Sequence, residues 1–361
     1  MKQAARQVAV IGAGTMGSGI AQKYASSGFR TIIIDNSQQA VLKSQAAIKG
    51  TLDQAITRGI YSEREALEIF DRIEWSHELQ KADRAELIIE AIFEDKLQKI
   101  SLIKALEEIC SNDALIATNT SSLKVADLQQ EMTFKGRFLG LHYFYPPSKN
   151  RLVELIGTKD THKNAMDKAR LWQGDINKIV IESKDSPGFI VNRFFVPWLN
   201  HAMSIVFEGV ASIATVEEAA KRFFKIPMGP FTLMNVTGLP ITYHASTALA
   251  HYLGSFYAPC PMLMKKMSEN SQWQIDGVVD ERLCMPVGLR LMAVVGAICC
   301  RMVQDEKICS KEDVDTGARV GLLWGKGPFE LMREHNKSMS ESFRELAIPK
   351  DYVTAFDNAL L

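Results

Sequence analysis

Residues 7–17 read QVAVIGAGTMG, and this stretch decides the fold of the chain. An apolar run of strand type, Gln7 to Ile11, leads into a glycine pattern, and residues 18–27 then read as a helix. A second apolar run, Arg30 to Ile34, ends on Asp35. A strand, a helix and a strand in this order are typical of the βαβ unit that opens a parallel sheet.

The spacing of Gly12, Gly14 and Gly17 predicts a dinucleotide-binding turn. We expect the first glycine to allow a tight turn, the second to let the backbone approach a pyrophosphate, and the third to let the helix pack closely on the strand. Asp35 would accept hydrogen bonds from the adenosine ribose and repel a 2′-phosphate, so the pattern predicts NAD as the cofactor. The alternative is a glycine turn that binds no ligand.

Strands and helices alternate through the first half of the chain. We expect strands at residues 85–91, 114–118, 138–142, 151–156 and 178–181, and helices at residues 37–58, 62–73 and up to Cys110. This alternation predicts an α/β Rossmann domain, doubly wound around a parallel sheet, over residues 1–185.

Strand signals nearly vanish after Pro187 and Gly188, and a weak internal repeat follows. Residues 193–234 and residues 290–332 both end in Gly-Pro-Phe-x-Leu-Met. Within the copies we align residues 215–218 with residues 310–313, each as the start of a helix. The repeat predicts an all-α domain built from two repeated helical units, with a first copy over residues 186–280 and a second, degenerate copy over residues 281–361.

Composition excludes several classes of protein. The chain has 361 residues with 42 basic and 42 acidic side chains, so its formal net charge of zero argues against binding to nucleic acid or to a membrane surface. The apolar stretch Leu291 to Cys300 is about half of the roughly 20 residues that cross a bilayer. We expect no secretory signal, because the chain runs almost directly into the first strand. The six cysteines lack the spacing of a metal site, so we expect reduced thiols in a cytoplasmic protein.

Four polar residues suit the oxidation of an alcohol. His142 follows a strand-like run, and a neutral histidine can take a hydroxyl proton because its pKa lies near working pH. Glu154 would accept the other ring N–H and fix the tautomer, as the acid does in a hydrolase triad. We expect Ser121 to bind the substrate oxygen and Asn192 to place an amide near it, in a cleft between the two domains at the carboxyl ends of the strands.

Each of these residues also has a structural interpretation. His142 alone reads as a core histidine, Ser121 as a turn residue, Glu154 as a strand-edge charge and Asn192 as a helix cap. Their joint occurrence behind a dinucleotide pattern favours the catalytic interpretation.

With these motifs the chain resembles the L-3-hydroxyacyl-CoA dehydrogenase family, from Val8 to about Asn270 and, through the repeat, to the C-terminus. The motifs that carry the resemblance are residues 12–17, 90–92, 119–123, 140–142, 185–193 and 227–231. The resemblance implies that His142 and Glu154 form the catalytic pair, with Ser121 and Asn192 assisting. It implies cofactor contacts at Gly12, Gly14, Thr15, Met16, Gly17, Asp35, Ala91, Ile92, Glu94, Lys99 and Asn119. It also implies that Thr51 and Arg58 contact the CoA part of an acyl-CoA thioester.

The resemblance extends to the organisation of the chain. Single-copy members of the family dimerise through the helical domain, whereas large bifunctional members carry two copies in one chain, one of which stands in for the partner. The repeat therefore implies a self-contained protomer, with a homodimer left open. Three places depart from the family pattern. Tyr145 replaces an asparagine on the nicotinamide side of the cofactor, and residues 271–277 replace a segment that closes over NAD. Asn235 stands where the family often has an aspartate, and Pro240 where another acid is common.

The leading hypothesis is the reversible NAD-dependent oxidation of an L-3-hydroxyacyl-CoA to the 3-ketoacyl-CoA, in the β-oxidation of fatty acids or related acyl-CoA compounds. One alternative is a dehydrogenase of a free hydroxy acid, as in the gulonate-type relatives. Another is a non-catalytic paralogue that binds NAD or CoA, which Tyr145 and the replaced segment 271–277 motivate.

Overall fold

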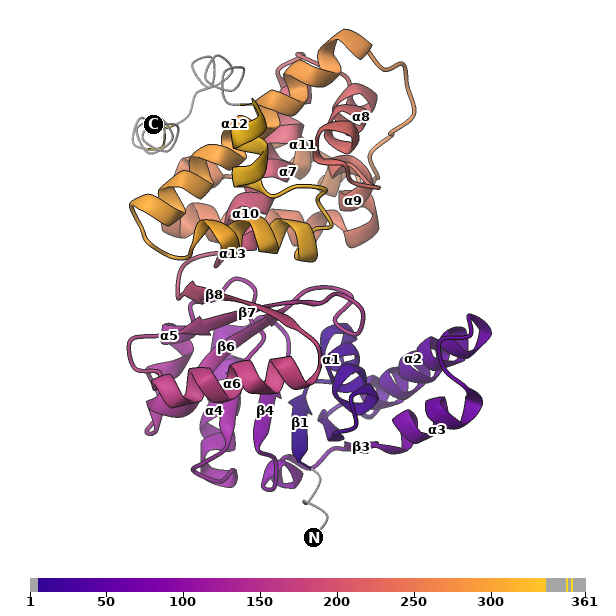
Figure 1. Ribbon diagram of the computed structural model, residues 1–361, viewed down its shortest axis with the longest axis vertical. Coiled ribbons are helices and arrows are strands. Elements are labelled where there is room, and N and C mark those ends of the chain that lie inside the picture. Colours follow the sequence, from indigo (N-terminus) through magenta and orange to yellow (C-terminus); the bar gives the residue numbers. More distant parts are fainter. Residues whose placement is uncertain (1–5, 336–348, 350–351, 353–361) are drawn as a thin grey trace. The chain divides into compact units, whose positions relative to one another are not determined.

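The computed structural model describes residues 6–335, Pro349 and Tyr352. The chain forms two compact units, Met1–Asp185 and Ser186–Leu361, which we call the α/β unit and the helical unit (Figure 1). Residues 336–348, 350–351 and 353–361 of the predicted second copy lie outside the described residues.

The α/β unit is built on an 8-stranded sheet with the order β3-β2-β1-β4-β5-β6-β7-β8. The strands are β1 (Gln7–Ile11), β2 (Arg30–Ile34), β3 (Ile73–Ser76), β4 (Leu87–Glu90), β5 (Leu115–Thr118), β6 (Phe138–Tyr143), β7 (Leu152–Gly157) and β8 (Ile179–Lys184). The chain winds outward from β1 in one direction through β2 and β3 and in the other through β4, β5 and β6, all in parallel. This order is that of a doubly wound sheet, as predicted.

Helices connect the strands of the α/β unit. They are α1 (Thr15–Ser26), α2 (Gln38–Thr57), α3 (Glu63–Asp71), α4 (Lys96–Ile109), α5 (Val125–Gln129) and α6 (Lys163–Asp175). Local signals set their starts: Ser37 caps α2 by accepting from the Ala40 N–H, and Ser62 begins α3 with a capping box. Tyr24 of α1 and Trp172 of α6 are buried against the strands in one apolar core.

Two features of the sheet differ from the sequence-based expectation. Strand β3 begins at Ile73, where we expected a helix to end. Strand β7 runs antiparallel to β6, and β8 runs parallel to β7. The cause lies in the connection of residues 144–151, because a parallel crossover needs about a dozen residues or more and this loop is shorter.

The helical unit is organised around its longest helix, α12. Its helices are α7 (Val191–Phe207), α8 (Ile213–Phe224), α9 (Pro230–Thr237), α10 (Leu239–Leu253), α11 (Pro261–Ser268), α12 (Glu281–Gln304) and α13 (Lys311–Thr316), with a further helix over residues 328–335. Helix α12 packs against α7 and α8 (Figure 1). By length and composition α12 alone among the described helices passes as a membrane span, but 78% of its most apolar window is buried inside the protein, as in the core helix of a bundle.

The helical unit repeats its backbone with a spacing of 98 residues, as from position 209 to position 307. Residues that are 98 positions apart share the same backbone conformation or the same place in a helix. The matched pairs are the left-handed residues Gly209 and Lys307, the left-handed residues Lys225 and Leu323, the N-caps Ser212 and Ser310, and the helix-opening prolines Pro230 and Pro328. The alignment of Thr215 with Ser310 was wrong by three residues, because Ser212 caps α8 and accepts from the Thr215 N–H at 3.2 Å.

Candidate active site

His142 and Glu154 form a buried pair across two neighbouring strands. The antiparallel register of β6 and β7 sets the two residues directly opposite each other. Side chains of directly opposed residues lie on the same face of a sheet, and here His142 Nδ1 lies 2.5 Å from Glu154 Oε2. Glu154 is fully buried and His142 is 6% exposed, so the hydrogen bond is formed away from water. Such a charge-assisted bond is short and strong.

The pair defines the chemistry of the imidazole. A carboxylate that accepts this hydrogen bond takes it from Nδ1–H, which leaves the lone pair of a neutral ring on Nε2. The Phe144 ring lies 4.6 Å from the imidazole ring, centroid to centroid, and covers part of it. The arrangement suits a general base whose tautomer and orientation are both held.

Hydrogen bonds join the residues that follow β1, β4 and β5 to the ends of neighbouring strands at one edge of the sheet. Gly12, Ala91 and Asn119 follow β1, β4 and β5, and their N–H groups donate to Ile34 O, Ile11 O and Glu90 O. Asn119 Oδ1 in turn accepts from the Tyr143 N–H at 2.9 Å. The carboxyl ends of parallel strands meet at one edge, which is where ligands bind in doubly wound sheets. The structure therefore brings His142 to the same edge as the glycine turn.

Glu94 holds the loop that carries Ser121. Its Oε1 accepts from the Thr120 hydroxyl at 2.5 Å, the Ser121 N–H at 2.9 Å and the Ser122 N–H at 3.0 Å. Burial alone would raise the pKa of Glu94, but Lys99 and these donors hold that pKa below its usual value. The Ser121 hydroxyl is exposed and makes no hydrogen bond to the residues that the structure describes, so it is available to a ligand.

Lys99 is buried beneath this loop. Its ammonium lies 2.6 Å from Glu90 Oε1 and 3.2 Å from Glu94 Oε2, and the side chain is 1% exposed. Glu90 Oε2 also accepts from the Thr118 hydroxyl at 2.6 Å. Buried charges need such pairing. We therefore assign Lys99 to holding Glu94 in place, where we had expected it to touch the cofactor. Glu90 and Thr118 were missed as members of this cluster, although an acid that ends the apolar run of β4 was a visible signal.

The glycine turn has the geometry that a pyrophosphate requires. Gly12 has φ of +111°, and a Cβ there would meet Ala91 O at 2.5 Å. A Cβ on Gly17 would lie 1.9 Å from Gly12 O, whereas a Cβ on Gly14 would meet nothing within 4 Å. Gly14 is the N-cap of α1, so open space lies where the free N–H groups of the helix begin. Thr15 and Met16 form the first turn of that helix.

Asp35 follows β2 and contacts the same turn. Its Oδ2 accepts from the Ala13 N–H and its Oδ1 from the Ser37 N–H, both at 2.8 Å. Each oxygen has a second lone pair, so the carboxylate supports the turn and still suits ribose hydroxyls. Ile92, behind β4, is half-buried and donates its N–H to Glu90 Oε1. These residues fit NAD.

Thr51 and Arg58 lie on one face of α2, about two turns apart. The Thr51 hydroxyl donates to Ala47 O at 2.8 Å and can still accept. Arg58 is exposed at the end of the helix and has no ion pair with another described residue. A free guanidinium there suits a phosphate.

Asn192 is the second residue of α7 and is half-buried. The N-cap of this helix is Ile190, without a side-chain cap, so the interpretation of Asn192 as a helix cap was wrong. Within the part of the chain that the structure describes, no hydrogen bond occupies its amide. Its joint action with His142 stays a prediction.

The segment 271–277 is docked on α9. Asn235 donates its amide to Trp273 O at 3.0 Å and accepts from the Trp273 N–H at 2.9 Å. The Trp273 ring packs on Phe231 with 5.3 Å between centroids. An aspartate at position 235 has no N–H to donate to that carbonyl, so the asparagine and the changed segment fit each other.

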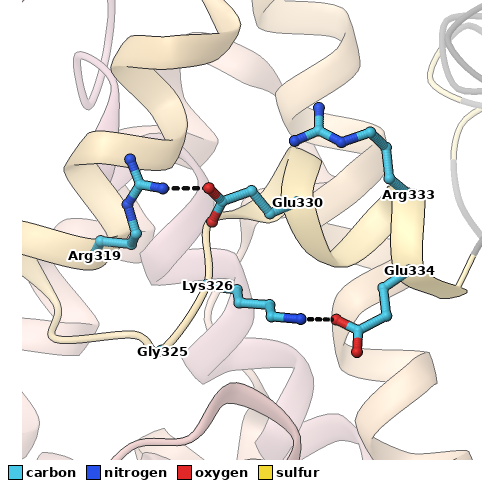
Figure 2. Close-up of a pocket in the computed structure, with 6 residues that line it drawn as sticks. All are labelled: Arg319, Gly325, Lys326, Glu330, Arg333 and Glu334. Atoms are coloured by element: carbon cyan, nitrogen blue, oxygen red, sulfur yellow. Dashed lines mark hydrogen bonds and ion pairs between the residues drawn. The ribbon is translucent and has the colours of Figure 1, made fainter.

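An open pocket lies elsewhere, on the second copy of the helical unit (Figure 2). Its lining residues are Arg319, Gly325, Lys326, Glu330, Arg333 and Glu334. Arg319 pairs with Glu330 and Lys326 pairs with Glu334, so most of its charges satisfy one another (Figure 2). None of the residues predicted for the chemistry lines this pocket.

Comparisons with known proteins identify the family of the chain. The family model of the 3-hydroxyacyl-CoA dehydrogenase NAD-binding domain matches residues 7–186, and that of the C-terminal domain matches residues 188–281. The 3-hydroxybutyryl-CoA dehydrogenase of Clostridioides difficile is 34% identical over 265 residues, which are 73% of this chain and 94% of that protein. The structure of (S)-3-hydroxybutyryl-CoA dehydrogenase from Ralstonia eutropha is 30% identical, with a TM-score of 0.71 over 74% of this chain and 95% of that one.

A more distant structure matches the whole length. The 3-hydroxybutyryl-CoA dehydrogenase of Escherichia coli K12 is 20% identical, and the match covers 99% of both chains with a TM-score of 0.86. It shows that the fold is shared through the second helical copy, which both family models leave unmatched.

The predicted cofactor and enzyme class are thereby confirmed. The NAD-binding model spans the glycine turn, Asp35 and the His142–Glu154 pair, so the cofactor is NAD and the protein is an oxidoreductase. The chain belongs to the 3-hydroxyacyl-CoA dehydrogenase family, whose NAD-binding and C-terminal domains it carries in that order.

Proposed function

We propose that the protein catalyses the reversible NAD-dependent oxidation of an L-3-hydroxyacyl-CoA to the 3-ketoacyl-CoA, with His142 as the general base and Glu154 as its partner. The observation that carries the proposal is the 2.5 Å hydrogen bond between His142 Nδ1 and Glu154 Oε2, at the sheet edge that carries the glycine turn. The names of the relatives, which are hydroxyacyl-CoA and hydroxybutyryl-CoA dehydrogenases, support the substrate class.

The residues divide the work of the reaction. His142 Nε2 takes the hydroxyl proton of the substrate, and the Glu154 carboxylate stabilises the imidazolium that results. The Ser121 hydroxyl and the Asn192 amide donate to the substrate oxygen and stabilise the negative charge that develops on it. Bound NAD supplies the acceptor for the hydride of the substrate carbon. In the reverse direction the imidazolium returns its proton to the oxygen.

Coenzyme A is bound, in this proposal, by α2. The exposed Arg58 pairs with a phosphate of the nucleotide, and Thr51 offers a hydroxyl on the same face of the helix. Acyl-CoA β-oxidation is the pathway in which such a step belongs. The six cysteines are free thiols, which supports the proposed cytoplasmic location. The second helical copy supports a self-contained protomer, with a homodimer as the alternative assembly.

The test is the consumption of NADH with acetoacetyl-CoA, followed with a panel of longer and aromatic 3-ketoacyl-CoA thioesters and with free 3-keto acids. We expect turnover of at least one thioester and little turnover of the free acids. Arg58→Ala should raise the Michaelis constant for the thioester by about tenfold, as for the loss of one charged hydrogen bond, and leave the Michaelis constant for NADH unchanged. Turnover of free acids that is insensitive to Arg58→Ala would replace the CoA substrate with a hydroxy acid. Binding of NADH without turnover of any compound would favour a non-catalytic protein.

A further inference from the structure

Two ion pairs connect the two copies of the helical unit, one at each end of α7. Arg193, in the first turn of α7, pairs with Glu306, which follows the end of α12. Arg290, in α12, pairs with Glu208, which follows the end of α7. Positions 208 and 306 have the same spacing of 98 residues as the backbone repeat. Glu208 and Glu306 are therefore equivalent positions of the repeat. Arg193 and Arg290 are 97 residues apart and are not equivalent, because the repeat counterpart of Arg193 is Leu291.

The two pairs differ in their surroundings. The Arg193 side chain is 1% exposed, and its Nη2 donates to both oxygens of Glu306 at 2.7 Å. The Arg290 side chain is 23% exposed, Glu208 is 47% exposed, and Arg290 Nε also donates to His201 Nε2 at 3.3 Å. The two carboxylates occupy equivalent positions of the repeat, but the ion pairs that they form differ in burial.

Arg193 also closes the turn that precedes α7. Its Nη1 donates to Ser186 Oγ and to Pro187 O, both at 3.2 Å, and its backbone N–H donates to Gly188 O at 3.0 Å. This turn contains two left-handed residues, Gly188 with φ of +74° and Phe189 with φ of +48°. A left-handed phenylalanine is uncommon and persists only where its surroundings hold it. The hydrogen bonds of Arg193 help to keep Phe189 in this conformation.

Asn192 lies between the turn and Arg193 in the sequence and belongs to the first turn of α7, whose direction the preceding turn sets. We infer that Glu306 of the second copy is a positioning residue for Asn192, because it holds the Arg193 guanidinium that fixes the turn and the first residues of α7. The inference rests on the proposed role of Asn192 at the substrate oxygen. The second copy, whose corresponding residues read Leu289-Arg290-Leu291 without an amide, then acts on the reaction through the first copy.

The experiment compares Glu306→Gln with the matched control Glu208→Gln in the full chain. Each variant removes one carboxylate charge at an equivalent position of the repeat, and Glu306→Gln also removes the partner of Arg301, whose Nε lies 2.9 Å from Glu306 Oε1. We expect Glu306→Gln to lower kcat with acetoacetyl-CoA by about tenfold to a hundredfold, since small misplacements of a contacting group have effects of that order, and to leave the Michaelis constant for NADH unchanged. Glu208→Gln should keep kcat within about twofold of the wild-type value.

A double-mutant cycle separates positioning from general stability. Asn192→Ala should lower kcat on its own, and adding Glu306→Gln to it should lower kcat little further, because the amide to be positioned is already gone. Glu306→Asp, which keeps the charge, should recover part of kcat and serves as the test variant if Glu306→Gln does not fold. Melting temperatures of all variants are measured in parallel.

Three results would overturn the inference. The first is a wild-type kcat in both Glu306→Gln and Glu306→Asp. The second is an equal loss of kcat in Glu306→Gln and Glu208→Gln. The third is a double variant whose loss of kcat is the product of the losses in Asn192→Ala and Glu306→Gln. Any of these, with an active wild-type enzyme, leaves the proposed function standing. A wild-type protein that does not turn over any thioester overturns the proposed function and this inference with it.

Discussion

Glu154→Gln is the perturbation that tests the catalytic pair most selectively. The two side chains have nearly the same shape, and the amide oxygen of glutamine can still accept from His142 Nδ1–H. The substitution therefore removes the negative charge and leaves the orientation of the ring in place. Because Glu154 is fully buried, water does not replace the lost charge.

The expected loss follows from the geometry. With 2.5 Å between Nδ1 and Oε2, the centres of the ring and carboxylate charges are about 4 Å apart. Two unit charges at that distance attract by about 4 kcal/mol at an effective dielectric constant of about 20. If the imidazolium is fully formed in the transition state, the loss of this attraction slows the chemical step by about 1,000-fold. A transition state with partial proton transfer loses less, so we expect kcat to fall by about 100-fold to 1,000-fold.

The assay is the steady-state oxidation of NADH with acetoacetyl-CoA, together with NADH binding and thermal melting of the same samples. The Michaelis constant for NADH should not change, because the glycine turn is untouched, and the protein should remain folded. A variant with more than about a third of the wild-type kcat would refute the assignment of Glu154, since electrostatic stabilisation of this size cannot be lost without a rate effect.

Three further predictions follow from other parts of the α/β unit. Gly14→Ala should leave the melting temperature near its wild-type value and weaken NADH binding at least about tenfold, because a Cβ there meets open space in the protein and fills the approach of the pyrophosphate; unchanged NADH affinity would contradict this. Gly17→Ala should instead lower the melting temperature, because its Cβ would lie 1.9 Å from Gly12 O, and a stable variant would contradict that close packing. Burial, with the charge of Lys23, lowers the pKa of Lys178 to about 7, so the unfolded chain binds the extra proton between about pH 7 and its usual 10.5. The free energy of unfolding of the wild type should therefore rise between pH 7 and 9 relative to that of Lys178→Met, by up to a few kcal/mol. If the difference in free energy of unfolding between the two proteins is the same at every pH in this range, Lys178 does not titrate there.

Local conformation was the part of the structure that could be predicted from sequence. The glycine turn could be recognised because each glycine is required by the backbone close to it. Gly12 has a positive φ, Gly17 lies against Gly12 O, and Gly14 leaves the N-terminus of α1 open. The start of α2 at Ser37 was predicted for the same reason, since a cap depends on the next few residues only.

Pairing between distant segments could be predicted only in part. His142 and Glu154 were expected to interact, but the antiparallel register that makes them directly opposed was not foreseen, although the short loop 144–151 excludes a parallel crossover. The burial of Lys99 between Glu90 and Glu94 was not foreseen either, because nothing local distinguishes a buried lysine from an exposed one on an amphipathic helix.

The departures from the family pattern gain a physical reason only in three dimensions. Asn235 and Trp273 are far apart in sequence, and from the sequence alone each looks like an unrelated departure from the family pattern. In the structure the asparagine side chain both donates to and accepts from the tryptophan backbone, so the two changes form one contact. The segment 271–277 is therefore a docked part of the helical unit.

The measurement that tests the central claim most directly is the rate of NADH oxidation with acetoacetyl-CoA by the wild type and by His142→Ala, with NADH binding measured in both. If His142 is the general base, the wild type consumes NADH rapidly, and the variant binds NADH equally well but turns over at least about 1,000-fold more slowly. A variant that binds NADH and keeps more than about a tenth of the wild-type rate would contradict the assignment of the proton transfer to His142.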